Sequence, residues 1–201
     1  MKIFLWVLLA VTASLLSFKL YTSQSADPKF TQPALPQLEE MHESEDTPTI
    51  QDSANYINAY ITFYGWVDND PSGRSIAYPN GRFPLSLHSE ASGTGTYDDP
   101  ITFASDPDAW AIGTILYVPY LKKYIIMEDW CSQCVINWQE HKKHHIDIWM
   151  ESGQQFKDEV LECENYWTKK SASVEINPLP DREVDTTSLF DKSKGECFSG
   201  Y

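Results

Sequence analysis

Apolar and polar side chains alternate along residues 57–64, which is the two-residue period of a half-buried β-strand. The apolar positions in this stretch are Ile57, Ala59, Ile61 and Phe63. Shorter strand-like runs follow at residues 101–104, 109–112, 114–118, 124–127, 145–149 and 173–176. Sequences rich in Gly, Pro, Asn and Asp separate these runs and are typical of turns. Short strands at this spacing predict a mainly β fold, either a small barrel or a sandwich.

One segment after residue 150 follows a helical period instead. Its apolar residues recur at steps of four, three and four, which places them on one face: Phe156, Val160, Cys163 and Trp167. Ser152 and Gln155 have the spacing of a capping box, so we expect the helix to begin there. We therefore predict one short helix packed against the barrel. Residues 130–144 are expected to form an irregular loop.

The N-terminal part of the chain differs from the rest in composition. An apolar run from Ile3 to Leu16 has the size of a signal-peptide core, and we interpret residues 1–25 as a signal peptide or an uncleaved anchor. Residues 26–56 combine prolines with clustered acids and show no period, which predicts a disordered linker. We expect the remainder to be secreted, with contact to a membrane only through an uncleaved anchor.

The charge balance is strongly acidic, with a formal net charge of −14. Removing residues 1–25 takes away Lys2 and Lys19 and leaves 13 basic against 29 acidic residues, a net charge of −16. Binding to phosphate backbones depends on clustered Lys and Arg, so this composition argues against nucleic acid as a partner. An acidic surface of this size favours solubility.

Four cysteines suggest two disulfides in an exported chain, although the sequence leaves the pairing open: Cys131, Cys134, Cys163 and Cys197. With Cys197 paired, residues 179–201 form an irregular tail tied to the domain. The alternative is a zinc site built from Cys131 and Cys134 with the nearby histidines His141, His144 and His145. Because an exported chain favours oxidation, we expect disulfides, with no resident metal and no cofactor.

The carboxylates of residues 128–147 are the main candidates for chemistry. Asp147 stands between Ile146 and Ile148 on a predicted strand, and Glu128 and Asp129 end the strand before it. Burial among branched apolar residues disfavours the ionised form and raises the pKa of a carboxyl group. Asp147 is therefore either a catalytic acid or a structural group that caps backbone amides. Asp106 precedes a proline, which is typical of a turn.

These acids lie in an ordered set of motifs that resembles a known domain. The motifs are Ala104-Ser105-Asp106-Pro107, residues 112–119, Glu128-Asp129 and His145-Ile146-Asp147-Ile148-Trp149. Together they resemble the 3D domain, a double-psi β-barrel of cell-wall lytic transglycosylases, in a group with rare-lipoprotein-A-like proteins, expansins and family 45 endoglucanases. Residues 62–65, His88, residues 93–100 and residues 174–178 are similar to a secreted subset of these barrels whose activity is largely unassigned.

The resemblance implies a six-stranded double-psi β-barrel over residues 57–178. It places the general acid and base at Asp147, with Asp129 and Asp106 shaping the site. The second carboxylate that ordinary glycoside hydrolysis needs has three candidates, Asp129, Asp68 and Asp98. The sequence departs from the family between Asp129 and Asp147, where a glycine-rich loop is replaced by a longer, bulky segment that carries two cysteines.

Aromatic and polar residues of the loops and motifs complete the expected substrate site: Tyr64, Trp66, His88, Tyr97, Asp98, Trp130 and Trp138. Flat aromatic rings suit the apolar faces of sugars. The first functional hypothesis is therefore a secreted barrel that engages cell-wall or extracellular polysaccharide, with or without cleavage by Asp147. The alternative is a non-catalytic secreted interaction module, such as a protease inhibitor or an effector that binds a host protein, because fold alone does not choose between them.

Overall fold

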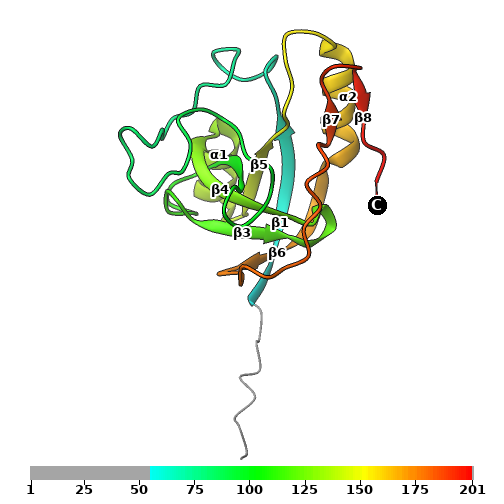
Figure 1. Ribbon diagram of the computed structural model, residues 1–201. Helices are drawn as coiled ribbons and strands as arrows, with labels where there is room; N and C mark the ends of the chain where they lie inside the picture. Colours follow the sequence, from blue (N-terminus) through cyan, green and yellow to red (C-terminus); the bar gives the residue numbers. More distant parts are fainter. Residues whose placement is uncertain (1–54, 201) are drawn as a thin grey trace, which may run out of the picture. The chain divides into compact units, whose positions relative to one another are not determined.

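The computed structural model describes residues 55–200, in which six strands close into a barrel (Figure 1). Around the barrel the strands follow the order β1-β5-β2-β4-β3-β6. Their bounds are β1 Asn55–Tyr64, β2 Ile101–Ser105, β3 Ile115–Val118, β4 Lys123–Trp130, β5 His145–Trp149 and β6 Lys169–Ile176. The predicted mainly β fold and six-stranded barrel are confirmed. The predicted signal peptide and nearly all of the predicted linker lie outside the described residues.

The barrel combines two parallel strand pairs with antiparallel ones. β1 runs parallel to β5 and β2 runs parallel to β4, whereas β2 pairs with β5 in the antiparallel sense. Apart from β3 and β4, which are consecutive, strands that are neighbours in the barrel are separated in sequence by at least one other strand. Closure leaves none of these six strands with an unpaired edge, which is how small β proteins avoid open edges.

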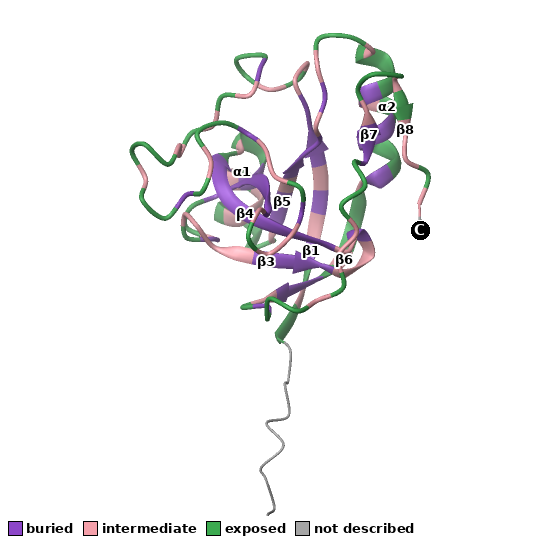
Figure 2. Ribbon diagram, in the orientation of Figure 1, coloured by how far each residue is buried: buried purple, intermediate pink, exposed green. Residues whose placement is uncertain are grey.

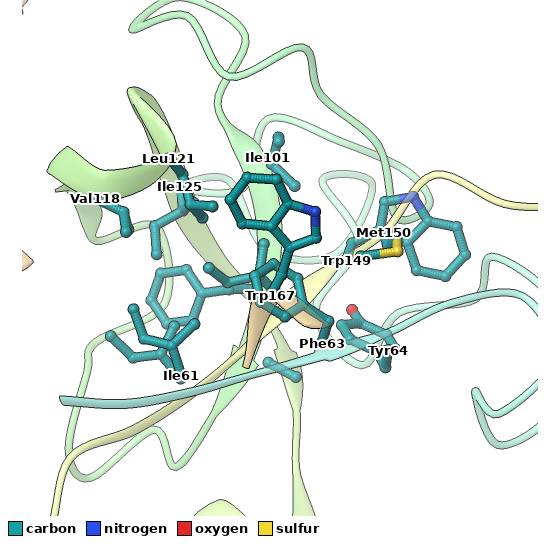
Figure 3. Packing of buried hydrophobic residues seen from close by; sticks show 14 of the residues in the cluster. Ile61, Phe63, Tyr64, Ile101, Val118, Leu121, Ile125, Trp149, Met150 and Trp167 are labelled. Carbon is teal, nitrogen blue, oxygen red and sulfur yellow. The ribbon is translucent and has the colours of Figure 1, made fainter. Parts of the chain in front are cut away.

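The core fills the barrel with branched and aromatic side chains, and the barrel strands carry most of the buried positions (Figure 2). Ile61, Phe103, Ile146 and Ile148 are completely buried, because inward positions alternate along each strand. Figure 3 shows aliphatic side chains gathered in this core, and Trp167 reaches the same cluster from a helix outside the barrel. Burial of this apolar surface supplies the main favourable term in folding.

Two α-helices and a 3-10 helix, η1 Pro119–Leu121, accompany the barrel in the described residues. The expectation of an irregular loop at residues 130–144 is wrong in part, because helix α1 occupies Ser132–His141. Only Cys134 is fully buried in α1, so the helix presents no apolar stripe that a periodicity argument would detect. Residues 109–112, expected as a strand, form a turn in which the amides of Ala109 and Trp110 donate to the Asp106 carbonyl.

Helix α2, Lys157–Trp167, is the helix that the sequence predicts, but it begins later. The expected capping box is wrong: the N-cap is Phe156, with φ 61°, and no side chain caps the helix. Ser152 instead accepts a hydrogen bond from the Trp66 amide, at 2.9 Å. Val160, Cys163 and Trp167 are buried as expected. Neither α-helix of residues 55–200 is long and apolar enough to cross a membrane.

The C-terminal tail is more ordered than predicted. It contains a two-stranded sheet, β7 Phe190–Asp191 and β8 Glu196–Cys197, which lies beside α2 (Figure 1). The buried Lys123 ammonium holds the preceding segment by donating to the carbonyls of Asp185 and Thr187. All four cysteines pair, as Cys131–Cys134 and Cys163–Cys197, so the two disulfides are confirmed. The second disulfide ties the tail to α2.

Candidate functional site

The strand register brings two of the three predicted aspartates into one row. Thr62 of β1 pairs with Asp147 of β5, Asp147 pairs with Ala104 of β2, and Ala104 pairs with Asp129 of β4. An irregularity between Phe103 and Ala104 shifts the β2–β4 register at this point, so that Asp129 joins the row. The small Ala104 side chain separates the two carboxylates and leaves space above them.

That space is a solvent-accessible pocket of about 500 Å³. Its floor includes the row residues Asp147, Ala104 and Asp129, and its walls come from the loop after β1 and from the start of α1. The lining residues are Tyr64, Asp68, Asn69, Asp70, Pro71, Ser75, Ile76, Ala77, Ala104, Asp129, Trp130, Cys131, Ser132, Gln133 and Asp147. A concave site with converging polar groups is the usual form of a small-molecule site.

Asp147 is half-buried at this floor, and its Oδ1 accepts a 2.6 Å hydrogen bond from Thr62 Oγ1. Burial raises the pKa of Asp147 from the ordinary 3.8 to about 7, and repulsion from Asp68 and Asp129 adds to the rise. The hydrogen bond from Thr62 acts in the opposite direction because it favours the ionised form. Asp147 therefore exists in both protonation states near neutral pH, which suits a general acid or base.

A chain of polar side chains behind Asp147 orients its partner Thr62. Gln133 Nε2 donates to Asn137 Oδ1, and Asn137 Nδ2 lies 2.8 Å from His145 Nδ1. His145 Nε2 in turn lies 2.8 Å from Thr62 Oγ1. Burial lowers the pKa of His145 to about 4, so the ring is neutral at pH 7. With Asn137 as donor to Nδ1, the Nε2 proton points to Thr62, whose own proton then points to Asp147.

Asp129 is held more rigidly than Asp147. Its Oδ1 accepts from the backbone amides of Ala77 and Trp130, both at 2.8 Å, and its Oδ2 accepts from the Tyr64 hydroxyl at 2.9 Å. Burial raises the pKa of Asp129, while these three donors favour its ionised form. The arrangement fixes the loop that carries Ala77 against the barrel. Asp129 therefore positions this loop, and its oxygens are occupied by hydrogen bonds within the protein.

Glu164 is a further carboxyl group near the site that the sequence reasoning missed. It projects from α2 and is buried, and Asp68 on the pocket wall lies close enough to raise its pKa. Burial raises its pKa to about 9, with added repulsion from Asp68 and Asp147, so it is protonated at pH 7. A signal was present, because Glu164 lies at helical spacing from Val160 and Trp167 on the packed face.

The other predicted residues divide into two groups. Tyr64 and Trp130 line the pocket with Asp129 and Asp147, and the Trp130 side chain is 51% exposed. Asp106 does not line it: this buried residue accepts from the Asp108 amide and from Gln139 Nε2, which stabilises a turn. These contacts agree with the interpretation of Asp106 as a turn residue.

The remaining predicted residues also lie outside this pocket. His88 bridges Glu128 and Asp99, at 2.7 and 3.2 Å, and so fastens its loop to the buried end of β4. Tyr97 packs edge-on against Tyr124, and Asp98 is exposed in the adjacent turn. Trp66 lines a separate shallow hollow with Arg74, and Trp138 packs against His144 with ring centres 4.8 Å apart.

The zinc alternative for the histidines near Cys131 meets a specific obstacle. The sulfurs of Cys131 and Cys134 and a ring nitrogen of His145 lie within 4.8 Å of one another, which resembles a partial ligand set. Both sulfurs are joined in a disulfide and are not thiolates, the form in which cysteine binds metals. His141 is exposed and is not part of this group.

The fold and the pocket define a closed six-stranded β-barrel protein with a pocket lined by carboxylates. Residues 56–198 match the DDB_G0273701 N-terminal domain family, and the chain belongs to that family. It is 38% identical over 141 residues to the uncharacterized protein DDB_G0273701/DDB_G0273221 of Dictyostelium discoideum. That match covers 70% of this chain and 60% of the Dictyostelium protein, so the chain spans less than two thirds of its relative. No solved structure matches the chain.

Proposed function

We propose that this protein is a secreted double-psi-type β-barrel that binds extracellular or cell-wall polysaccharide and cleaves glycosidic bonds with Asp147 as general acid. The observation that carries the proposal is the position of Asp147, a half-buried carboxyl group with a pKa of about 7 on the floor of an open pocket. A glycosidic oxygen leaves readily only when it is protonated. An acid that keeps its proton near neutral pH meets that requirement.

The hydrogen bonds around Asp147 favour one direction of proton transfer. Thr62 donates to Oδ1, so the acidic proton belongs on Oδ2, the oxygen that Thr62 leaves free. Because His145 is neutral and its Nε2 faces Thr62, the chain behind the acid carries no positive charge that would lower the pKa of Asp147. The single-acid route then needs the sugar itself to supply the internal nucleophile.

Asp68 is the better candidate where a second carboxylate takes part. It lines the pocket and is exposed, whereas Asp129 is occupied by three donors and Asp98 lies elsewhere. Asp68 Oδ1 accepts from the Gly65 amide, which fixes the start of its loop. The exposed Trp130 ring at the pocket edge offers a flat face for a sugar. Two disulfides fit an oxidising compartment, where such polymers occur.

The test combines binding and product release. The purified protein is incubated with insoluble peptidoglycan, cellulose and chitin, and both retention and release of reducing ends or anhydro-sugars are measured. We expect Asp147→Asn to abolish release but keep retention, and Trp130→Ala to weaken retention. Asp181→Asn, which removes an exposed charge in the tail, is the matched control and should behave as wild type. Equal release by wild type and Asp147→Asn would refute the acid role.

The second candidate, a protein-binding module, has one observation in its favour. Leu85 and Leu87 are 71% and 47% exposed on the loop between β1 and β2, although that loop is fixed to the barrel. The His88 and Leu87 amides donate to the buried Glu128, so the exposed leucines are held in place. If the wild-type protein neither binds nor cleaves any of the three polymers, the polysaccharide proposal is refuted. The exposed leucines would then favour a protein-binding function.

A further inference from the structure

We propose that the Cys131–Cys134 disulfide is a thiol–disulfide exchange site, and that it reacts preferentially with cationic dithiols that enter the pocket. The two cysteines are three positions apart and open helix α1, with Cys131 as N-cap and Cys134 in the first turn. Cys131 is half-buried and lines the pocket, whereas Cys134 is 1% exposed. One sulfur is therefore open to attack and the other is shielded.

The start of α1 stabilises the products of such an exchange. The Cys134 amide donates to Cys131 Sγ at 3.1 Å, and the other amides of a first helical turn have no partner within the helix. A thiolate at a helix N-terminus is stabilised by these amides and by the helix dipole. A ring nitrogen of His145 lies within 4.8 Å of both sulfurs, so a polar side chain adjoins the buried pair.

The exchange consists of two successive substitutions at sulfur. A thiolate of the incoming dithiol attacks Cys131 Sγ, the disulfide breaks, and the electron pair leaves on Cys134 Sγ, which takes a proton from solvent. The second thiolate of the dithiol attacks its own sulfur in the mixed disulfide, and Cys131 leaves as a thiolate. Two electrons pass from the dithiol to the pair, and the dithiol becomes a disulfide. Exchange with a further disulfide reverses these steps, and the Cys134 proton returns to solvent.

The charge of the pocket determines which thiols approach. Its fifteen lining residues, all within the described part of the chain, include four aspartates and neither lysine nor arginine. These aspartates are Asp68, Asp70, Asp129 and Asp147. A pocket lined by one sign of charge raises the association rate of ligands of the opposite sign. Thiols that carry a positive charge should therefore react faster than anionic ones.

The second disulfide provides an internal comparison. Cys163 lies in the middle of α2 and is 1% exposed, and its partner Cys197 is 34 positions away in the tail. No helix N-terminus stabilises a thiolate at Cys163, and this disulfide joins two elements of the fold. We therefore expect Cys163–Cys197 to remain oxidised under conditions that open Cys131–Cys134.

The experiment measures how fast each disulfide opens in the folded, full-length protein. Two monothiols, the cationic cysteamine and the anionic 3-mercaptopropionate, carry out the first substitution only, which opens the disulfide. They are supplied at equal thiolate concentration, and alkylation with peptide mass spectrometry follows each pair. We expect cysteamine to open Cys131–Cys134 about tenfold faster than 3-mercaptopropionate does, with the near-UV spectrum of the fold unchanged. High salt should reduce this ratio. Cys134→Ser, which leaves Cys131 as a free thiol, should form a mixed disulfide at Cys131 when cystamine, the disulfide of cysteamine, is supplied, with cysteamine as the leaving thiol.

Matched variants separate a local effect from a general one. Asp70→Asn removes an exposed charge of the pocket and should reduce the preference for cysteamine, whereas Asp181→Asn in the tail should not. The proposal is overturned if the pair opens no faster than in an unfolded peptide of residues 128–137, if both thiols react equally, or if opening requires loss of the fold. Cys134→Ser, whose residue does not line the pocket, should lose the disulfide exchange while glycan cleavage continues, so the two functions fail independently.

Discussion

Replacing Asp147 with asparagine should stabilise the barrel at alkaline pH and leave it nearly unchanged at acid pH. Burial raises the pKa of this carboxyl group to about 7, so between about pH 4 and 7 the folded protein keeps a proton that the unfolded chain releases. The free energy of unfolding of the wild type therefore falls as the pH rises through this window. Asparagine is never charged, and its amide oxygen still accepts the hydrogen bond from Thr62.

The magnitude follows from the two pKa values. A rise from 3.8 to about 7 corresponds to about 4 kcal/mol at 1.36 kcal/mol per pH unit, as an upper value. Water at the open pocket reduces the cost of the charge, so we expect a difference on the order of 2 kcal/mol between the wild type and Asp147→Asn at pH 8. At pH 4 most of this difference should disappear.

Urea unfolding at pH 4, 6 and 8, followed by tryptophan fluorescence, measures this effect. Asp70→Asn serves as the control, because it removes an exposed aspartate that lines the same pocket. Its effect should be small at every pH. An Asp147→Asn variant that is no more stable than the wild type at pH 8, or that gains equally at pH 4 and pH 8, would refute the assignment of a buried, uncompensated charge.

Three other substitutions test further parts of the fold. Glu164→Gln should change the free energy of unfolding at pH 7 by less than about 1 kcal/mol, because the pKa of about 9 leaves Glu164 uncharged there. Lys123→Met should cost about 1–3 kcal/mol and speed amide exchange in residues 183–188, because the carbonyls of Asp185 and Thr187 lose their donor. Gly93→Ala should cost more than about 1 kcal/mol, since Gly93 has φ +107° and the added Cβ would lie 2.1 Å from the Pro100 carbonyl oxygen.

Each of these expectations has a direct check by denaturant unfolding, with hydrogen exchange added for Lys123→Met. If Glu164→Gln stabilises the protein at pH 7 by well over about 1 kcal/mol, the carboxyl group is charged in the folded protein, because Gln would then remove a buried charge repelled by Asp68 and Asp147. Unchanged exchange in residues 183–188 would show that Lys123 does not hold the tail. A Gly93→Ala variant of wild-type stability would contradict the conformation of the turn at residues 93–95.

The barrel strands could be predicted because β1 alternates apolar and polar residues, whereas β2, β3 and β4 are short, nearly continuous buried runs bounded by turn residues. Helix α1 could not, since only Cys134 of its ten residues is fully buried and no apolar face repeats along it. The turn at residues 109–112 is apolar enough to suggest a strand. Its conformation is decided by Asp106, whose carbonyl accepts two amides and whose side chain accepts a third.

The sequence allowed Asp147 to be predicted as the central residue of the candidate site. It did not allow the residues that surround Asp147 to be predicted. Asp147 could be singled out because an acid between two isoleucines on a strand is unusual and has a raised pKa when buried. Its proximity to Asp129 and Thr62 depends on a register across four strands, which local sequence does not encode. Asp68 and Glu164 reach the site from a loop and from α2, so their contribution depends on packing that only the folded chain reveals.

The order in which the strands appear along the chain has a consequence for biosynthesis. β6, which bridges β1 and β3 and so closes the barrel, is the last of the six to be synthesised. Until residues 169–176 are available, a growing or truncated polypeptide presents two unpaired strand edges that can associate with other chains. Completion of the barrel therefore awaits the synthesis of residues 169–176, and a premature stop before Lys169 should yield aggregates instead of a smaller domain.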